Sequence, residues 1–422
     1  MGSLELPRFA RLAGALAVVV GCRGPHAPLA PKATWLVVAP HPDDETLIAS
    51  GVVAAAVEAG ERVEVVILTN GDYDCVVSGY IRQRESVDGL AHLGLPESAI
   101  HFLGYPDGGL PHLGFEKPLD QRRVDRNGTC KLGNATYGSR GFAGAEAHRV
   151  RTGDHATFTR GNLVGDLARE IAELHPTDIV VTHPMDTHPD HASAYHFVRD
   201  ALDTLDFAPR LHRALVHNGD CWPTGGEPHE PCPPPSFDTD MPTPQLTGQL
   251  AGYIPRERRP VPEAMLVREH DRNPKLLAIG THRTQTRGAE KSYLYGFARQ
   301  DEPFFPEQLS REGRRWVRVG RAGRRWRQRI RRGNGRAVLT EAGEAYEVVV
   351  DTTHRQAECR RSGDGVLLST WPLPFDLWTT EEEEEELTVA IDPRPEDGDV
   401  VEVSLRWGEA LVGVAVDPRG LR

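Results

Sequence analysis

The stretch Val37 to Glu45, VVAPHPDDE, places a polar turn directly after a run of apolar residues. The apolar residues Trp35 to Ala39 predict a buried strand, which stops at Pro40. A helix is predicted next over Thr46 to Ala59, and Gly60 closes it. Strand, polar turn and helix in this order are typical of a site at the carboxyl end of a parallel sheet.

The polar turn carries side chains that bind metal ions. His41 and Asp44 lie three positions apart, so we expect them to bind one ion together. Imidazole and carboxylate groups suit zinc or a similar divalent ion. Asp43 is then left beside the ion, where it is predicted to handle protons.

The same order of elements occurs a second time. Asp178 to Thr182 predicts another buried strand, and Ala192 to Leu205 predicts the helix that follows the turn. The turn between them, His183 to His191, reads HPMDTHPDH. Because the carboxyl ends of parallel strands share one edge of the sheet, the two turns are expected to meet. The alternative is that these aspartates only cap helices, but two such turns favour metal binding.

A catalytic zinc site keeps three protein ligands and one position for water. His41, Asp44 and His191 are the predicted ligands of one Zn²⁺ per chain, or of another divalent ion. The predicted reaction is attack of metal-bound hydroxide on a carbonyl carbon, with Asp43 as the general base. His188 is predicted to stabilise the oxyanion and to protonate the leaving nitrogen. Asp190 is predicted to stabilise the charged form of His188.

Length and composition set the wider class. With 422 residues, the chain is long enough for two domains. Alternating strands and helices predict an α/β fold with a mostly parallel sheet, and short strands beyond residue 307 predict a small all-β domain of the sandwich type. The net charge of −12 argues against general nucleic-acid binding. No Gly-x-Gly-x-x-Gly follows the first strand, which argues against a dinucleotide site.

Residues 1–32 have the features of a targeting segment and tether. Arg8 and Arg11 flank the start of the apolar stretch Leu12 to Val20, which is too short to span a bilayer. The stretch ends at Gly21-Cys22, which resembles the lipobox of bacterial lipoproteins. We therefore expect an exported protein, held at a membrane through lipidated Cys22 or released outside the cytoplasm. An ordinary secretory signal or the plain amino terminus of a cytoplasmic protein are the alternatives.

The other cysteines fit export. Cys221 and Cys232 bracket a loop rich in Pro and Gly, and Cys75 and Cys130 are expected in loops above the sheet. Each pair is a candidate disulfide outside the cell, and inert thiols are the alternative.

The carboxyl-terminal part contains a basic stretch. Arg311 to Arg336 is dense in arginine, with Trp316 and Trp326 between the arginines. Such a surface suits an anionic glycan or lipid headgroup. The simpler alternative is a charged face packed beside the glutamate run Glu381 to Glu386.

Several of these motifs resemble one known family. Ala39 to Glu45 resembles the Ala-His-Pro-Asp-Asp-Glu signature of the PIG-L/LmbE-like zinc N-deacetylases, with Pro40 as an extra residue. His188-Pro189-Asp190-His191 resembles the second motif of that family. Weaker matches follow the family's order and together extend the resemblance over about residues 34–300: Arg82-x-x-Glu85, Asp107-Gly108, Lys275-x-x-Ala278 and His282-x-x-Gln285.

The resemblance implies a Rossmann-like fold and removal of acetyl from an N-acetylglucosamine-type amide. It implies that His41, Asp44 and His191 bind the metal, that Asp43 is the general base and that His188 stabilises the oxyanion. It also places Arg82 and Asp107 near the sugar pocket. The predicted organisation is a signal segment and tether over 1–32, a deacetylase domain over 33–306 and a β-rich accessory domain over 307–422.

Two functions from different classes follow. The first is an exported zinc N-deacetylase that acts on an N-acetylated amino sugar or glycan. The second is a catalytically inert surface lipoprotein that binds glycans through the basic β domain.

Overall fold

The computed structural model describes residues 32–125, 128–219, 222–224, 239–241, 255–312, 315–318, 324–331, 336–338, 345–351, 353–374, 384–394 and 400–417. From Ala33 onward the described residues belong to one compact unit. The predicted signal segment with Cys22 and the Cys221–Cys232 pair lie outside the described residues. No described helix is long and apolar enough to cross a bilayer.

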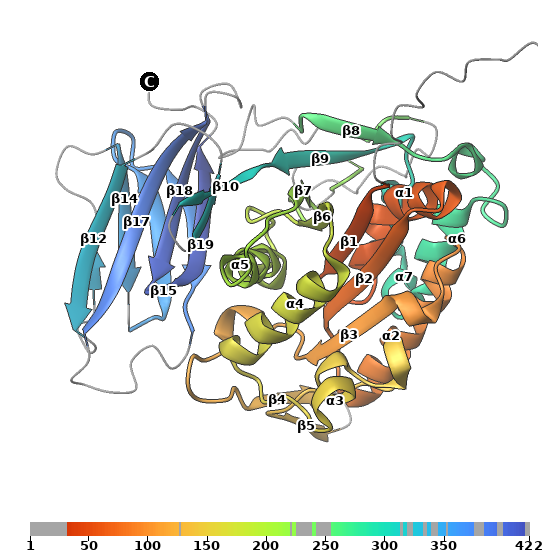
Figure 1. The fold of residues 1–422 in the computed structure, drawn as a ribbon, viewed down its shortest axis with the longest axis horizontal. Helices are drawn as coiled ribbons and strands as arrows, with labels where there is room; N and C mark the ends of the chain where they lie inside the picture. Colours follow the sequence, from red (N-terminus) through yellow and green to blue (C-terminus); the bar gives the residue numbers. More distant parts are fainter. Residues whose placement is uncertain are drawn as a thin grey trace, which may run out of the picture. The chain divides into compact units, whose positions relative to one another are not determined.

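A seven-stranded sheet forms the centre of residues 34–307, with the order β3-β2-β1-β6-β7-β9-β8 (Figure 1). The first five strands of this order run parallel, and β9 and β8 join antiparallel at the edge. The predicted α/β class with a mostly parallel sheet is confirmed. The strands are β1 (Thr34–Ala39), β2 (Arg62–Thr69), β3 (Ile100–Tyr105), β6 (Asp178–Thr182), β7 (Arg210–Ala214), β8 (Glu257–Pro260) and β9 (Asp301–Glu307).

Helices cover both faces of this sheet (Figure 1). Alternate residues of β1 enter different cores, because successive side chains of a strand point to opposite faces. Val37 packs in the core that includes Leu47 of α1, and Val38 packs in the core that includes Leu167 of α4. The helices are α1 (Asp44–Ala59), α2 (Val76–Ala91), α3 (Ala147–Thr152), α4 (Arg160–Leu174), α5 (Pro189–Asp203), α6 (Pro274–Thr281) and α7 (Arg283–Thr286).

The strand order reverses direction at β1. Its neighbour on one side is β2 and on the other is β6, where Val38 lies beside Val181. Ligands of open parallel sheets bind at such a switch point, outside the carboxyl ends of the strands. The turns after β1 and β6 are the two turns that the sequence marks with histidine and aspartate.

Residues 108–160, between β3 and α4, contain short elements of regular structure. A two-stranded antiparallel sheet forms from β4 (Gln121–Asp125) and β5 (Gly128–Gly133), and α3 follows it. Cys75 and Cys130 form a disulfide with a Cα–Cα distance of 5.9 Å, so this predicted pair is confirmed. The disulfide joins the start of α2 to the β4–β5 hairpin.

The carboxyl-terminal strands form two four-stranded sheets, β12-β17-β18-β19 and β13-β14-β15-β16. Both sheets contribute to one core, in which Val348 of β14 and Val389 of β17 are buried, as expected of a sandwich. A separate pair joins β10 (Leu309–Glu312) and β11 (Arg315–Arg318). The sandwich strands are β12 (Arg324–Arg331), β13 (Arg336–Val338), β14 (Tyr346–Asp351), β15 (Gln356–Arg361), β16 (Leu367–Pro372), β17 (Glu384–Arg394), β18 (Val400–Trp407) and β19 (Ala410–Asp417).

The arginine-rich strand lies beside the glutamate run. In the β12–β17 register, Arg329 pairs with Glu386 and Arg331 pairs with Glu384. Arg327 Nε also lies 3.8 Å from Glu386 Oε1. The register and this contact place the described end of the glutamate run beside the arginine-rich strand, as the simpler alternative for the basic stretch expects.

Candidate active site and metal centre

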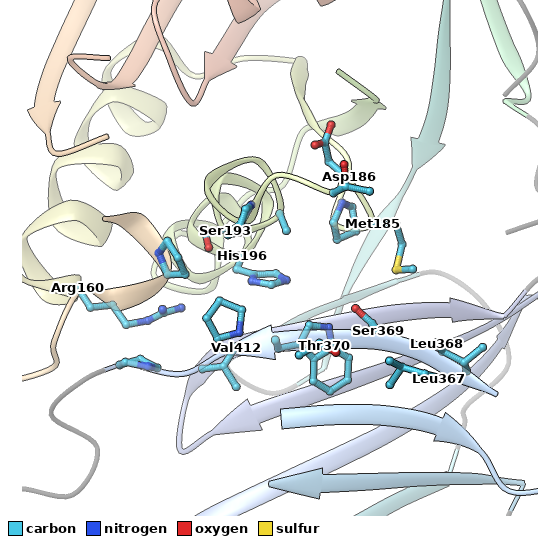
Figure 2. A pocket seen from close by; sticks show the side chains of 18 residues that line it. Arg160, Met185, Asp186, Ser193, His196, Leu367, Leu368, Ser369, Thr370 and Val412 are labelled. Atoms are coloured by element: carbon cyan, nitrogen blue, oxygen red, sulfur yellow. The ribbon is translucent and has the colours of Figure 1, made fainter. Parts of the chain in front are cut away.

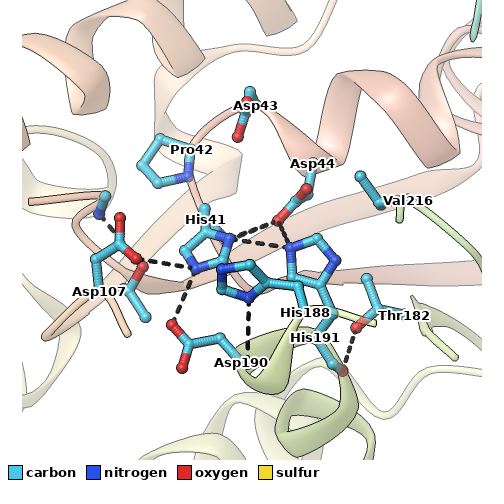
Figure 3. A network of polar contacts seen from close by, with 12 residues as sticks. His41, Pro42, Asp43, Asp44, Asp107, Thr182, His188, Asp190, His191 and Val216 are labelled. Atoms are coloured by element: carbon cyan, nitrogen blue, oxygen red, sulfur yellow. Dashed lines mark hydrogen bonds and ion pairs between the residues drawn. The ribbon is translucent and has the colours of Figure 1, made fainter. Parts of the chain in front are cut away.

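Three ligand atoms from the two polar turns converge on one point (Figure 3). His41 Nδ1 lies 3.2 Å from Asp44 Oδ2 and 3.0 Å from His191 Nε2. The third side of the triangle, His191 Nε2 to Asp44 Oδ2, measures 3.2 Å. All three side chains are buried, and the His41 backbone N–H donates to Asp44 Oδ2 at 2.9 Å. The structure thus brings together the three predicted ligands.

This convergence fits a divalent cation. Two protonated ring nitrogens 3.0 Å apart would repel each other, and a single proton on one of them can be donated to the other nitrogen or to the Asp44 oxygen but not fully to both. A cation satisfies all three atoms at once, and two imidazoles with one carboxylate are a donor set that zinc accepts. A ring nitrogen of His188 also lies within 4.8 Å of the His41 and His191 nitrogens.

Carboxylates behind the two histidines orient their rings. His41 Nε2 lies 3.0 Å from Asp190 and 3.3 Å from Asp107. His191 Nδ1 lies 3.3 Å from Asp186. Such partners fix the tautomer and the orientation of a metal-binding imidazole. Although burial alone would raise the pKa of Asp44, the adjacent His191 and His41 hold that pKa well below its usual value.

The hydrogen bonds of Asp190 show a role that differs from the predicted one. Its carboxylate accepts the backbone N–H of Gly108 at 2.6 Å and that of Leu110 at 3.1 Å, and it contacts His41. No hydrogen bond joins this carboxylate to the ring of His188 in the described part of the chain. Two backbone donors from the loop after β3 turn the carboxylate toward His41, so Asp190 is a positioning residue for that histidine.

His188 caps helix α5. Its Nδ1 accepts the backbone N–H of Asp190 at 3.3 Å, which leaves Nε2 to carry the proton of the neutral ring. Burial, with His41 and His191 nearby, lowers the pKa of His188 to about 4. The ring is therefore a neutral N–H donor on the wall of the catalytic pocket.

Asp43 lies beside the converging ligands and is buried. Its φ of 143° is a backbone conformation that side-chain-bearing residues rarely adopt, which is common at functional sites. Arg82 Nη2 donates to Asp43 Oδ1 at 3.0 Å. Burial raises the pKa of Asp43 to about 6, against the opposing effect of Arg82.

Arg82 and Asp107, the predicted sugar-pocket residues, both line the catalytic pocket. Each also holds the site together: Arg82 Nη1 lies 3.4 Å from Asp107, and Arg82 Nη2 donates to the carbonyl of Pro42 at 2.9 Å. The guanidinium passes so close to Gly71 that a Cβ there would lie 2.5 Å from it. Their hydrogen bonds within the protein make them positioning residues for Asp43 and His41.

The catalytic pocket has a volume of about 520 Å³. Sequence reasoning missed several of its residues, among them Tyr73 and Tyr293 on the wall. It also missed His217, whose ring centroid lies 4.9 Å from that of His191. His217 follows β7, the next parallel strand after β6, so the rule that locates sites at strand ends would have found it. The sequence also contained a signal for Asp186 as a site residue, because it lies inside the second polar turn.

The family described as GlcNAc-PI de-N-acetylase (PIG-L) matches residues 36–202. No curated protein matches the chain significantly. Among solved structures, the N,N'-diacetylchitobiose deacetylase of Pyrococcus horikoshii is 16% identical, with 65% of this chain and 83% of that chain covered and a TM-score of 0.38. A conserved protein of Thermus thermophilus is 19% identical, with 64% and 93% covered and a TM-score of 0.35. The zinc-inhibited form of a teicoplanin deacetylase is 15% identical, with 68% and 98% covered and a TM-score of 0.38.

The matched residues include both polar turns, Asp43, Arg82 and Asp107. They run from β1 into α5 and so contain the switch point of the sheet. Residues 36–202 of this chain are a domain of the PIG-L family.

Proposed function

We propose that this protein is a metal-dependent hydrolase that removes the N-acetyl group from an N-acetylglucosamine-type amino sugar or a related glycoconjugate. The observation that carries the proposal is the convergence of His41, Asp44 and His191 within 3.2 Å of one another, inside a PIG-L domain and beside Asp43. We assign one Zn²⁺ per chain to these three ligands. Such an ion, when bound, supplies Lewis acidity that polarises a carbonyl and lowers the pKa of water.

The residues around the ligands have separate tasks. Asp43 accepts the proton of the attacking water, and Arg82 holds its carboxylate in place at 3.0 Å. Once protonated, Asp43 also returns the proton to the leaving nitrogen. His188 donates its Nε2–H to the oxygen of the amide as negative charge develops there. Its lowered pKa suits this hydrogen bond better than the proton delivery that the sequence predicts.

Export supports a glycan as the substrate. We propose that residues 1–32 direct the chain out of the cytoplasm and that Cys22 attaches it to a membrane. The Cys75–Cys130 disulfide supports the proposal, because stable disulfides are typical of oxidising compartments. A Cys22→Ala variant should move from the membrane fraction to the soluble exported fraction. An unchanged distribution would count against lipidation.

The inert glycan-binding alternative has less support. It requires a free basic surface on the β domain, whereas the arginine-rich strand β12 pairs with the glutamate-bearing start of β17. Asp43, which an inert protein does not need, is buried against Arg82 at the ligand site.

Elemental analysis joined to a substrate screen tests the proposed function. The purified full-length protein should contain about one zinc per chain and release acetate and free amine from N-acetylated sugars. A chelator should abolish this release, and added zinc should restore it. A zinc-loaded protein that cleaves no N-acetylated sugar would overturn the proposal.

A further inference from the structure

A second cavity lies between helix α5 and the sandwich (Figure 2), and we name it the junction pocket. One wall comes from the loop Pro184 to Pro189 and from α5, which contributes Ser193 and His196. The opposite wall comes from β16 and from Val412 of β19. Its volume of about 320 Å³ is at the lower end of the range for small-molecule pockets.

The junction pocket and the catalytic pocket share a loop. His188 lines the catalytic pocket, whereas its neighbours Thr187 and Pro189 line the junction pocket. Helix α5 also serves both sites, with His191 at the ligand triangle and His196 in the junction pocket. The rise along the helix between these two histidines is about 7.5 Å. The two pockets are therefore neighbours that are separated by this loop and by the first turns of α5.

Among the described residues, two buried polar atoms near the junction pocket have no hydrogen-bond partner. They are His196 Nε2 and Arg160 Nε, on side chains that are each 5% exposed. Both residues line the pocket, and Figure 2 shows the His196 ring between Ser193 and the strand that carries Thr370. A buried polar group without a partner is unfavourable, so a ligand that bonds to it gains affinity.

The pocket favours an uncharged ligand. Its two charged residues are already paired: Arg160 Nη2 lies 2.6 Å from Asp200, and Asp186 accepts the backbone N–H groups of Val216 and His217 at 2.7 and 2.9 Å. Burial and the nearby Arg160, Arg406 and Arg199 lower the pKa of His196 to about 3, so its ring is neutral.

The remaining lining combines hydroxyl groups with rigid apolar surface. Ser193, Ser369 and Thr370 offer hydroxyls. Trp371, Met185 and several prolines offer apolar surface. A sugar ring has this same combination, with hydroxyls around its edge and C–H groups on its faces. An acyl chain would leave the hydroxyls and His196 Nε2 unpaired, which disfavours it.

We propose that the junction pocket binds a second sugar ring of the glycan whose N-acetylated ring enters the catalytic pocket. The inference rests on the proposed deacetylase function and narrows its substrate to an oligosaccharide. It also gives the sandwich a role, because β16 and β19 form the wall that α5 alone cannot supply.

The test compares a short and a long substrate in full-length, zinc-loaded protein. Acetate release is measured from N-acetylglucosamine and from tetra-N-acetylchitotetraose. The wild type should cleave the tetrasaccharide with a kcat/KM at least about tenfold higher, equivalent to about 1.4 kcal/mol. Thr370→Trp fills the pocket and should reduce this preference to near one, while the rate on the monosaccharide stays unchanged. Thr353→Trp places the same change at an exposed position outside the pocket and should keep the preference.

A second variant and a binding measurement keep the test independent of folding and of catalysis. His196→Phe keeps a ring but removes Nε2, and it should also reduce the preference. Calorimetry with cellotetraose, which has no amide, should show binding to the wild type and to Thr353→Trp but not to Thr370→Trp.

The outcomes separate the two proposals. Equal cleavage of both substrates by the wild type, or a preference that survives Thr370→Trp, would overturn the junction pocket as a sugar site. If no N-acetylated sugar is cleaved but cellotetraose binding is lost in Thr370→Trp, the deacetylase function falls and the sugar site stands.

Discussion

His41 Nδ1 lies 3.0 Å from His191 Nε2, although 150 positions separate the two residues in the chain. The contact exists because β1 and β6 are parallel neighbours, so that the turns after them share one edge of the sheet. Asp44 completes the triangle from the first turn of α1. The triangle therefore requires the pairing of β1 with β6 as well as the three ligand residues themselves.

Removing one ligand should release the metal. We expect His41→Ala and His191→Ala to lose bound zinc and all acetate release. Asp186→Asn changes the carboxylate beside His191 but keeps all three ligands, and it should weaken zinc affinity by about 10- to 100-fold. Competition with a chromophoric chelator measures these affinities. The exposed His92 provides a matched control, and His92→Ala should bind zinc like the wild type. Full zinc content in His191→Ala would remove that residue from the ligand set.

Replacing the base should separate catalysis from metal binding. Asp43→Asn removes the proton acceptor but none of the three ligands, so kcat should fall by about 10²- to 10⁴-fold while zinc content stays near one per chain. Asp74 lines the same pocket at an exposed position, and Asp74→Asn should leave kcat almost unchanged. Single-turnover acetate release together with elemental analysis gives both quantities. Turnover by Asp43→Asn at the wild-type rate would show that another group takes the proton.

The sequence predicted the centre of the fold because two signals agreed there. Apolar runs marked β1 and β6 as buried strands, and each run ended in histidine and aspartate. The orientation of Asp190 had no comparable signal. Its carboxylate is directed by the backbone N–H groups of Gly108 and Leu110, about 80 positions away, and their approach depends on how the loop after β3 folds.

The sandwich strands β15 and β19 were not predicted from sequence, for local reasons. Gly413 interrupts β19, and glycine weakens the signal of a strand. In the sandwich its missing side chain gives room to the indole of Trp371. Strand β15 reads QAECRR, in which charged residues hide the alternation of buried Ala357 and Cys359. In both strands, the residues that are unusual for a strand make sense only from contacts that form in the folded sandwich.

The Cys75–Cys130 disulfide should stabilise the protein measurably. The bridge closes a loop with a sequence separation of 55. Loop-closure entropy for that length predicts a loss of about 4 kcal/mol in the free energy of unfolding when both cysteines become serine. Urea denaturation under oxidising conditions measures the loss. Cys359→Ser alters a buried free thiol, so that variant should still lose stability when a reductant is added. A double variant as stable as the wild type would show that the bridge contributes nothing.

The stability of the fold should fall in mild acid because of His196. Burial and the three nearby guanidinium groups lower its pKa to about 3 in the folded protein, against about 6.5 in the unfolded chain. Below pH 6.5 the unfolded chain therefore binds a proton at His196 that the folded protein does not bind. Each further pH unit down to the folded pKa costs up to about 1.4 kcal/mol from this residue. At and above about pH 7.5 the effect is absent, because the ring is neutral in both states.

His196→Phe isolates this contribution, because phenylalanine has a similar ring and no proton to bind. The unfolding temperature of the variant relative to the wild type should rise steadily as the pH falls from about 7 to about 5. His92→Ala changes an exposed histidine and should leave the pH dependence unchanged. If the wild type and His196→Phe lose stability in parallel over that range, His196 must be protonated in the folded state. In that case, carboxylates that lie closer to Arg160, Arg199 and Arg406 than their present partners would have to offset the positive charges of these three residues.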